Sequence, residues 1–160
     1  MTQLQPMVTD KQWNQAIEDL TLGIIELTRD IKFKISDKTT NNYNTFLAEP
    51  SLTISREGCY KTIYGNPYVN ILARAWHDTL HISKHKSFSL EDELAIAKLQ
   101  KGTLFNTLVL NGIPTDRAEL ASTILFIDIY EQVLYYDKTK NFVDNQLDFV
   151  KSKLNQYLKA

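Results

Sequence analysis

Three histidines, which are all the histidines in the chain, lie four residues apart at His77, His81 and His85. On a helix, residues four apart lie one turn above each other on the same face. Neutral imidazoles on consecutive turns can bind one transition-metal ion, because this spacing brings two ring nitrogens within reach of a single centre. The spacing therefore predicts a site for metal binding or for acid–base chemistry.

Two protein ligands seldom suffice for a metal ion, so a third ligand, usually a carboxylate, must come from another part of the chain. The downstream candidates are Glu91, Glu93, Asp128 and Glu131. Asp78 directly follows the first histidine, where it could orient a ligand or act on a bound water. Zinc or another divalent transition metal would lower the pKa of that water toward neutrality and supply a hydroxide nucleophile.

The histidines fall within a helix that the sequence predicts from about Pro67 to about Lys84. Asn66 supplies a capping side chain, and proline suits the first turn of a helix. Most of the circumference is apolar, with one stripe formed by Val69, Leu72, Trp76 and Leu80. The remaining polar wedge contains Asn70, Arg74, His77 and His81, with Asp78 at its edge. Because buried polar groups need partners, this wedge indicates a site. We expect His85 to act as a favourable charge near the helix C-terminus.

The stretch from His77 to His81, His-Asp-Thr-Leu-His, resembles the His-Glu-x-x-His helix of the zincin metallopeptidases. Residues 91–97 are similar to the glutamate-bearing second helix of the small ImmA/IrrE-like members, so the resemblance covers residues 53–100. It implies that both histidines are metal ligands, that Glu93 or Glu91 is the third ligand, and that Asp78 is the general base. Aspartate is one methylene shorter than the family's glutamate, so it would reach less far toward a metal-bound water.

Two other enzyme families share part of this pattern. His77 followed by Asp78 is also the doublet of the all-helical HD-type phosphohydrolases, in which Asp128 could supply the distant aspartate. Those sites need a further histidine upstream, and no histidine precedes His77, so one chain cannot form a complete HD site. Helical nucleotide pyrophosphatases hold magnesium between carboxylates on facing helices. The chain has enough acidic residues for such a site but not that family's paired Glu-x-x-Glu spacing.

The same residues also permit a non-catalytic interpretation. Glu91 and Glu93 would be first-turn acids that interact with the helix dipole. Asp128 with Glu131 would pair with Arg74 or with a buried tyrosine, and an ion pair from Arg74 to a carboxylate would satisfy the wedge without a metal. The protein would then be a helical interaction or modulator protein. The overall look of the chain resembles small bacteriophage proteins, so the expected partner is a host protein or a second copy of the chain.

Composition limits the class of protein. With 160 residues, 43% of them hydrophobic, the chain can bury a sizeable core as a single domain of residues 1–160. The formal net charge of −1 is unlike the basic footprint of a dedicated nucleic-acid binder, so no nucleic-acid partner is expected. No apolar run is long enough to span a membrane. The single cysteine and the absence of a signal-peptide pattern predict a cytoplasmic location.

The remaining pattern predicts a mainly α fold, a compact bundle of about five helices. Thr9 with Gln12 has the capping-box spacing and precedes a narrow apolar seam. Later helices are predicted at 89–110, from 115 onward, and from near Asn141 with Asp144 as its partner. Residues 36–51 predict a loop with one short helical turn. β-branched and aromatic runs at 52–55 and 60–64 predict a small β-hairpin before the His-bearing helix.

Overall fold

The protein is described by a computed structural model that places residues 7–39 and 42–159. In these ranges the chain forms the helices α1 Asp10–Thr28, α2 Tyr43–Ala48, α3 Pro67–Ser83, α4 Leu90–Leu110, α5 Thr115–Thr139 and α6 Gln146–Lys159. Two short strands, β1 Lys34–Ser36 and β2 Thr53–Ser55, pair in parallel. The prediction of a mainly α bundle with a small β element is confirmed. No helix of the described ranges is both long and apolar enough to cross a lipid bilayer.

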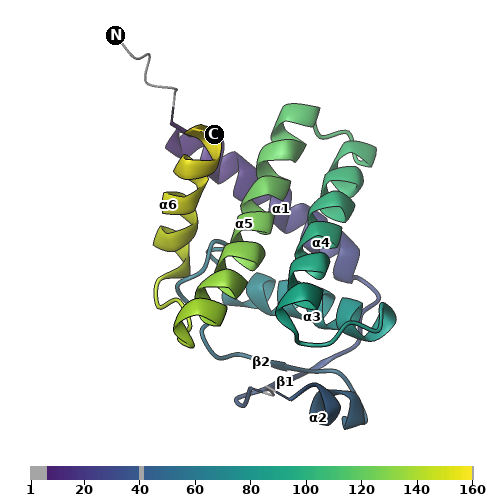
Figure 1. Ribbon diagram of the computed structural model, residues 1–160. Helices are drawn as coiled ribbons and strands as arrows, with labels where there is room; N and C mark the ends of the chain where they lie inside the picture. Colours follow the sequence, from purple (N-terminus) through teal and green to yellow (C-terminus); the bar gives the residue numbers. More distant parts are fainter. Residues whose placement is uncertain (1–6, 40–41, 160) are drawn as a thin grey trace.

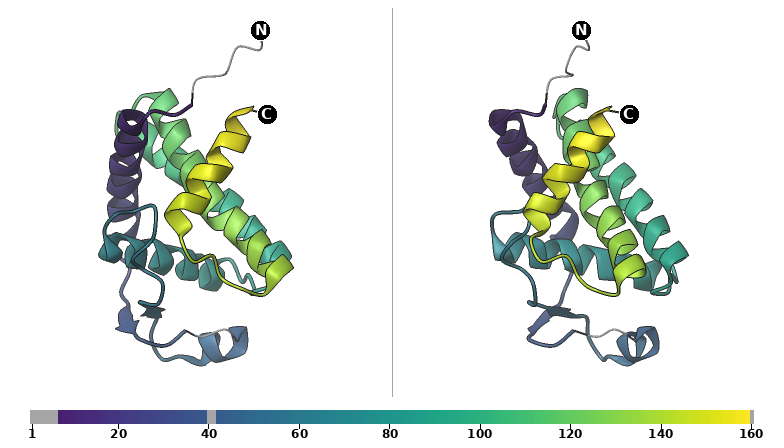
Figure 2. Two further views of the ribbon diagram at one scale, coloured as in Figure 1. Left: turned by 90° about the vertical axis from the view of Figure 1, so that its left-hand side faces the viewer. Right: turned by 60° about the vertical axis from the view of Figure 1, so that its left-hand side comes forward.

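The longest helices form the body of the fold. Helices α4 and α5 pack side by side, α1 contacts both of them, and α6 packs on α5 (Figure 1). Helix α3 lies across the lower end of this group, with the two strands and α2 below it (Figure 2). His77 and His81, in the C-terminal part of α3, contact Glu93 in the first turn of α4. The corner between these two helices positions the candidate site.

Local signals explain where the helices begin. The predicted capping box is present, because Thr9 N donates to Gln12 Oε1 at 2.9 Å and Gln12 N donates to Thr9 Oγ1 at 3.1 Å. Asn66 accepts a hydrogen bond from Tyr68 N at 2.9 Å and caps α3. Ser89 accepts one from the backbone of Asp92 at 3.2 Å and caps α4. These caps satisfy backbone donors that have no partner within the helix.

The main core joins five of the helices. Its buried apolar residues include Trp13, Leu20, Ile24, Trp76, Leu104, Leu108, Ile124, Leu125, Ile127 and Val150. The apolar seam of α1 is therefore part of the core of the chain. Trp76 inserts from α3, so the apolar side of the His-bearing helix is anchored while its polar side faces elsewhere.

The predicted β-hairpin at 52–64 is wrong. Strand β2 is present, but it pairs in parallel with β1, with Ile54 opposite Ile35, and residues 60–64 form no strand. Ile63 and Tyr64 are buried in the helical core instead. A β-branched run favours a strand but does not specify which segment pairs with it. Ile63 and Tyr64 pack against the helices, and residues 60–64 do not pair with β2. The expected short helical turn in 36–51 is confirmed as α2.

The last helix begins later than predicted. Helix α5 continues to Thr139, and Lys140 then adopts a left-handed conformation that ends it. Helix α6 starts at Gln146 rather than near Asn141. The Asn-x-x-Asp spacing recurs at Asn145, whose side chain accepts a hydrogen bond from Asp148 N at 3.0 Å. The second of two equivalent capping signals is thus the one used.

Candidate metal centre

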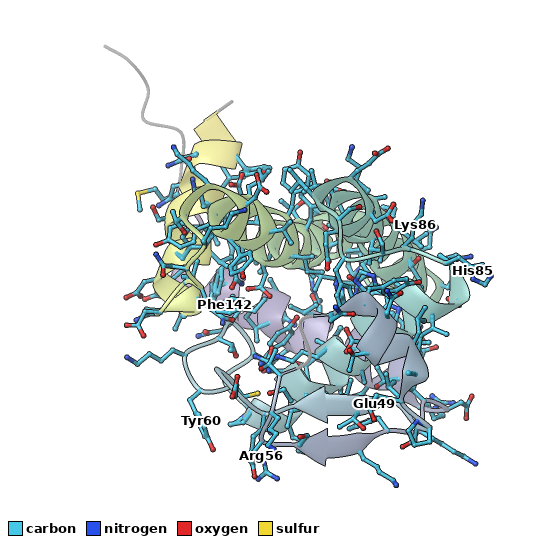
Figure 3. The ribbon with its side chains drawn as sticks, turned by 60° about the horizontal axis from the view of Figure 1, so that its bottom comes forward. Glu49, Arg56, Tyr60, His85, Lys86 and Phe142 are labelled. Atoms are coloured by element: carbon cyan, nitrogen blue, oxygen red, sulfur yellow. The ribbon has the colours of Figure 1, made fainter. Side chains whose placement is uncertain are left out.

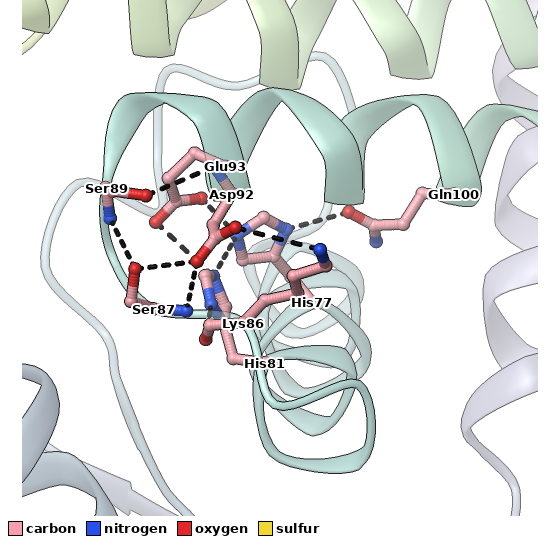
Figure 4. A network of polar contacts seen from close by, with 8 residues as sticks. All are labelled: His77, His81, Lys86, Ser87, Ser89, Asp92, Glu93 and Gln100. Atoms are coloured by element: carbon pink, nitrogen blue, oxygen red, sulfur yellow. Dashed lines mark hydrogen bonds and ion pairs between the residues drawn. The ribbon is translucent and has the colours of Figure 1, made fainter.

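The polar wedge predicted for α3 is present. Asn70 and His81 are buried, and Arg74 and His77 are partly buried, on the side of α3 away from Trp76. Because the apolar face of the helix is fixed in the core, the rotation of α3 is set and both imidazoles point toward the start of α4 (Figure 4). The helix therefore presents two potential ligands at one place.

Glu93, in the first turn of α4, reaches both histidines. Its Oε2 lies 2.9 Å from His77 Nε2, and its Oε1 lies 3.3 Å from His81 Nε2. The two Nε2 atoms are 3.1 Å apart, and one ligand atom from each of the three residues lies within 4.8 Å of the others. Tetrahedral zinc with bonds of about 2.0–2.1 Å places its ligand atoms about 3.3 Å apart. The three side chains are thus spaced to share one ion.

The second nitrogen of each ring is fixed by a hydrogen bond. His77 Nδ1 lies 2.7 Å from Gln100 Oε1, and His81 Nδ1 lies 2.9 Å from the backbone oxygen of Lys86. In this orientation of the Gln100 amide, both partners are acceptors, so both Nδ1 atoms carry hydrogen. The lone pairs of the two rings are therefore on the Nε2 atoms, which face Glu93.

The two Nε2 lone pairs and the Glu93 carboxylate need a positive charge between them. At 3.1 Å, two Nε2 lone pairs cannot face each other unless a proton or a metal ion lies between them. Burial lowers the pKa of His77, but the hydrogen bond and the negative charge of Glu93 outweigh it and raise that pKa to about 9. Burial raises the pKa of Glu93, but hydrogen bonds from His77 and His81 lower it to about 2. The pair is thus an imidazolium and a carboxylate whenever no metal ion replaces the proton.

The centre is open on one side. The His81 side chain is 1% exposed, whereas those of His77 and Glu93 are 20% and 19% exposed. Structural zinc sites have four protein ligands and are closed, while catalytic sites keep three and leave a position for water or substrate. Three candidate ligands with partial access to solvent match the catalytic arrangement.

A loop between α3 and α4 holds the Lys86 carbonyl in place. Asp92 Oδ2 accepts hydrogen bonds from Ser87 N and from Ser87 Oγ, both at 2.7 Å (Figure 4). These hydrogen bonds lower the pKa of the Asp92 carboxyl. The Phe88 ring packs edge-on against His81, with 4.9 Å between the ring centroids. The loop therefore fixes the orientation of His81 from two directions.

The third histidine does not join the centre. His85 lies beyond the end of α3 with φ at 52°, and Figure 3 shows its side chain pointing away from the molecule. It is exposed, and the helix has already ended at Ser83. The expectation that His85 stands apart from the other two histidines agrees with this position.

Of the four downstream acids, Glu93 is the one that the structure brings to the histidines. Glu91 is exposed, because two residues along a helix turn a side chain to another face. Asp128 accepts a hydrogen bond from Gln132 at 2.6 Å, and burial raises its pKa to about 7. Glu131 accepts a hydrogen bond from Tyr157 at 3.0 Å. Neither of these two acids belongs to the group of potential metal ligands within the described residues.

Asp78 and Arg74 flank the centre in different ways. Burial raises the pKa of Asp78, and the positive charge of His77 opposes this rise. Arg74 donates to the backbone oxygen of Ser55 at 2.7 Å. Across residues 7–39 and 42–159 it forms no ion pair with a carboxylate. The alternative in which an Arg74–carboxylate bridge satisfies the wedge is therefore wrong.

Sequence reasoning missed the groups that orient the histidines. Gln100 is 1% exposed, and its Nε2 is buried without a hydrogen-bond partner among the described residues. It lies seven residues after Glu93, two turns further along the same face of α4. A polar residue at that spacing, on the helix face that otherwise carries Ile96, Ala97 and Leu104, was a usable signal. The Lys86 carbonyl carries no such signal, because any residue has a backbone oxygen.

Comparisons of this chain with protein families, with curated proteins and with solved structures find no match. A function can therefore be inferred only from the geometry of the candidate centre. That geometry comprises two oriented imidazoles, one carboxylate and a side open to solvent.

Proposed function

We propose that the protein is a metal-dependent, hydrolase-like domain in which His77, His81 and Glu93 hold zinc or another divalent transition metal. The supporting observation is the arrangement of the four ring nitrogens. Both Nδ1 atoms meet acceptors, and both Nε2 atoms point at the Glu93 carboxylate. Histidines that ligate metals almost always donate their other N–H to an oxygen acceptor in this way. Two imidazoles and one carboxylate are also a donor set used in catalytic zinc sites.

The neighbouring groups suit hydrolysis. A bound metal ion polarises a carbonyl or phosphoryl oxygen and lowers the pKa of a bound water. Asp78 is proposed as the group that accepts the proton of that water, because it directly follows the ligand His77 on α3. Gln100 holds the ring of His77, and the α3–α4 loop holds that of His81. The ligand roles of His77, His81 and Glu93 and the base role of Asp78 are the ones that the resemblance to zincins implies, with aspartate in the position of the glutamate.

A second candidate function is favoured by one observation. The imidazolium of His77 and the carboxylate of Glu93, 2.9 Å apart, form a complete ion pair without a metal. In that case the polar wedge is an internal network that fixes the α3–α4 corner. The protein would then be a helical interaction protein, of the kind that a phage uses to modulate a host protein.

Metal analysis of untagged, natively purified protein separates the two candidates. We expect zinc, manganese or iron near one equivalent in the wild type and in the matched controls His85→Ala and Glu91→Gln. His77→Ala, His81→Ala and Glu93→Gln should lose the metal. A wild type that takes up no metal even after reconstitution contradicts the metal centre and leaves the interaction protein.

Catalysis needs a separate measurement. In the metal-loaded protein, Asp78→Asn should keep the metal and lower the rate of peptide or phosphoester hydrolysis by about 10²–10⁴-fold, the usual contribution of a general base. Retention of full activity by Asp78→Asn contradicts the role of Asp78. Loss of metal in the same variant would instead make Asp78 a ligand.

A further inference from the structure

The turn that follows β2 leaves a space between two hydrogen-bond donors. Gly58 is exposed and has φ at 66°. A side-chain carbon at this position would lie 3.7 Å from Arg74 Nη2 and 3.8 Å from Gln146 Nε2. Because glycine has only a hydrogen there, a guanidinium from α3 and an amide from α6 flank an open position at the surface.

Only one of the N–H groups of the Arg74 guanidinium is seen to donate a hydrogen bond within the described residues. Its Nη1 donates to the Ser55 backbone oxygen at 2.7 Å, and in the described part of the chain it makes no ion pair. Two carboxyls, those of Asp78 and Asp128, interact with the charge of Arg74 without forming an ion pair with it. Asp128 is a weak counter-charge for it, because burial raises the pKa of this carboxyl to about 7 and its Oδ1 already accepts from Gln132. The guanidinium therefore retains the capacity to bind an anion.

A third donor lies on the same face of α3. Asn70 precedes Arg74 by one helical turn, is 5% exposed, and has a buried Nδ2 without a hydrogen-bond partner among the described residues. A buried amide donor without an acceptor is rare in folded proteins, so this amide needs a partner that the described residues do not supply. The Gln146 side chain is partly buried, and its amide is free to donate because it is not among the side chains with a hydrogen bond in the described ranges. Arg74 and Gln146 thus bring donors to this turn.

We propose that the turn at Gly58 is an oxyanion subsite, in which Arg74, Gln146 and Asn70 bind a carboxylate or phosphate group. Guanidinium and amide N–H groups are suitable donors to such oxygens. Assigning this anion to the substrate rests on the proposed function. His77 lies within one turn of Arg74 on α3, so the proposed substrate would direct its anionic group to the turn at Gly58 and its reacting bond to the metal centre.

The test uses the full-length, metal-free protein, so that anion binding is measured separately from metal binding. Inorganic phosphate and acetate are titrated in parallel by calorimetry, and the side-chain amide signals of Asn70 and Gln146 are followed by NMR. We expect saturable binding of one anion, with shifts of both amide signals. Tighter binding of phosphate identifies a phosphate-bearing substrate, and tighter binding of acetate identifies a carboxylate. No saturable binding of either anion overturns the subsite.

Variants locate the bound anion. Arg74→Met should weaken binding about tenfold or more, the effect of losing one charge-assisted pair of hydrogen bonds. Asn70→Leu removes the unpaired amide at similar volume, so the protein should fold while its affinity for the anion falls. Arg56→Met is the matched control, because Arg56 pairs with Asp37 and points outward next to the turn (Figure 3). An equal loss in Arg56→Met overturns the proposal.

Zinc titration of the same variants keeps the two proposals distinct. Arg74 and Asn70 are outside the group His77, His81 and Glu93, so both variants should bind zinc as the wild type does. Anion binding in a protein that takes up no zinc supports the subsite and contradicts the hydrolase. Zinc binding without anion binding supports the metal centre and overturns the subsite.

Discussion

His77 Nδ1 lies 2.7 Å from Gln100 Oε1, across 23 residues of sequence. This hydrogen bond joins the polar face of α3 to the interior of α4, and it determines which nitrogen of His77 is available to Glu93. When Gln100 accepts this hydrogen bond, its Nε2 is left buried without a partner among the described residues. A residue that leaves a donor unsatisfied contributes little to stability, so we infer that its role is to orient the imidazole.

Gln100→Leu tests this role. We expect the affinity for zinc to fall by about 10–100-fold, as is typical when a group that orients a ligating histidine is removed. The free energy of unfolding of the metal-free protein should change by less than about 1 kcal/mol, because the unpaired amide is lost together with the hydrogen bond. Competition with a chelator measures the affinity, and urea unfolding measures the stability. Gln100→Glu, which retains an acceptor, should bind zinc more tightly than Gln100→Leu, and equal affinities would contradict this interpretation.

Metal binding should also stabilise the fold. A ligand present at 100 times its dissociation constant raises the free energy of unfolding by about 2.7 kcal/mol if it binds the folded state alone. We therefore expect zinc to raise the melting temperature of the wild type, and a chelator to reverse the rise. The double variant His77→Ala/His81→Ala should melt at the same temperature with and without zinc. A similar zinc effect on both proteins would indicate binding elsewhere.

The buried carboxyl of Asp128 predicts a pH dependence of stability. Burial raises its pKa to about 7 in the folded state, opposed by a hydrogen bond from Gln132 and by the charge of Arg74. The ordinary value for aspartate is about 3.9. Between these values the folded protein binds a proton that the unfolded chain does not, so the stability from this group is present at low pH and is lost as the pH rises toward 7.

Asp128→Asn isolates this effect. In the wild type this group lowers the free energy of unfolding by at most about 1.4 kcal/mol per pH unit between its two pKa values. The variant should lack that contribution, so the difference between the two proteins should grow from about pH 4 to about pH 7 in favour of the variant. Urea unfolding over this range measures it. Parallel curves for the two proteins would show that Asp128 titrates normally.

Two glycines in helices should respond oppositely to alanine. A Cβ on Gly23 of α1 would collide with the Leu104 side chain of α4, whereas one on Gly102 of α4 would meet nothing nearby. We expect Gly23→Ala to destabilise the fold by about 1–3 kcal/mol through overpacking. Gly102→Ala should stabilise it by about 0.5–1 kcal/mol, because alanine favours a helix. Thermal unfolding of both variants measures this, and equal effects would contradict the close approach of α1 to α4.

Features that depend on residues close together in the chain could be predicted from the sequence. The caps at Thr9, Asn66 and Ser89 and the polar face of α3 follow from residues within a few positions of one another. Helical periodicity alone places His77 and His81 on one face, one turn apart. The same information separated His85 from that pair, since the helix was expected to end near it.

The groups that contact this face from distant parts of the chain are set by the packing of the helices. Glu93 joins the histidines while Glu91, Asp128 and Glu131 do not, because the α3–α4 corner brings one face of the first turn of α4 against α3. The pairing of β2 with β1, rather than with residues 60–64, likewise depends on where the core buries Ile63 and Tyr64. Contacts between residues far apart in sequence depend on the packing of whole helices, and no local pattern encodes that packing.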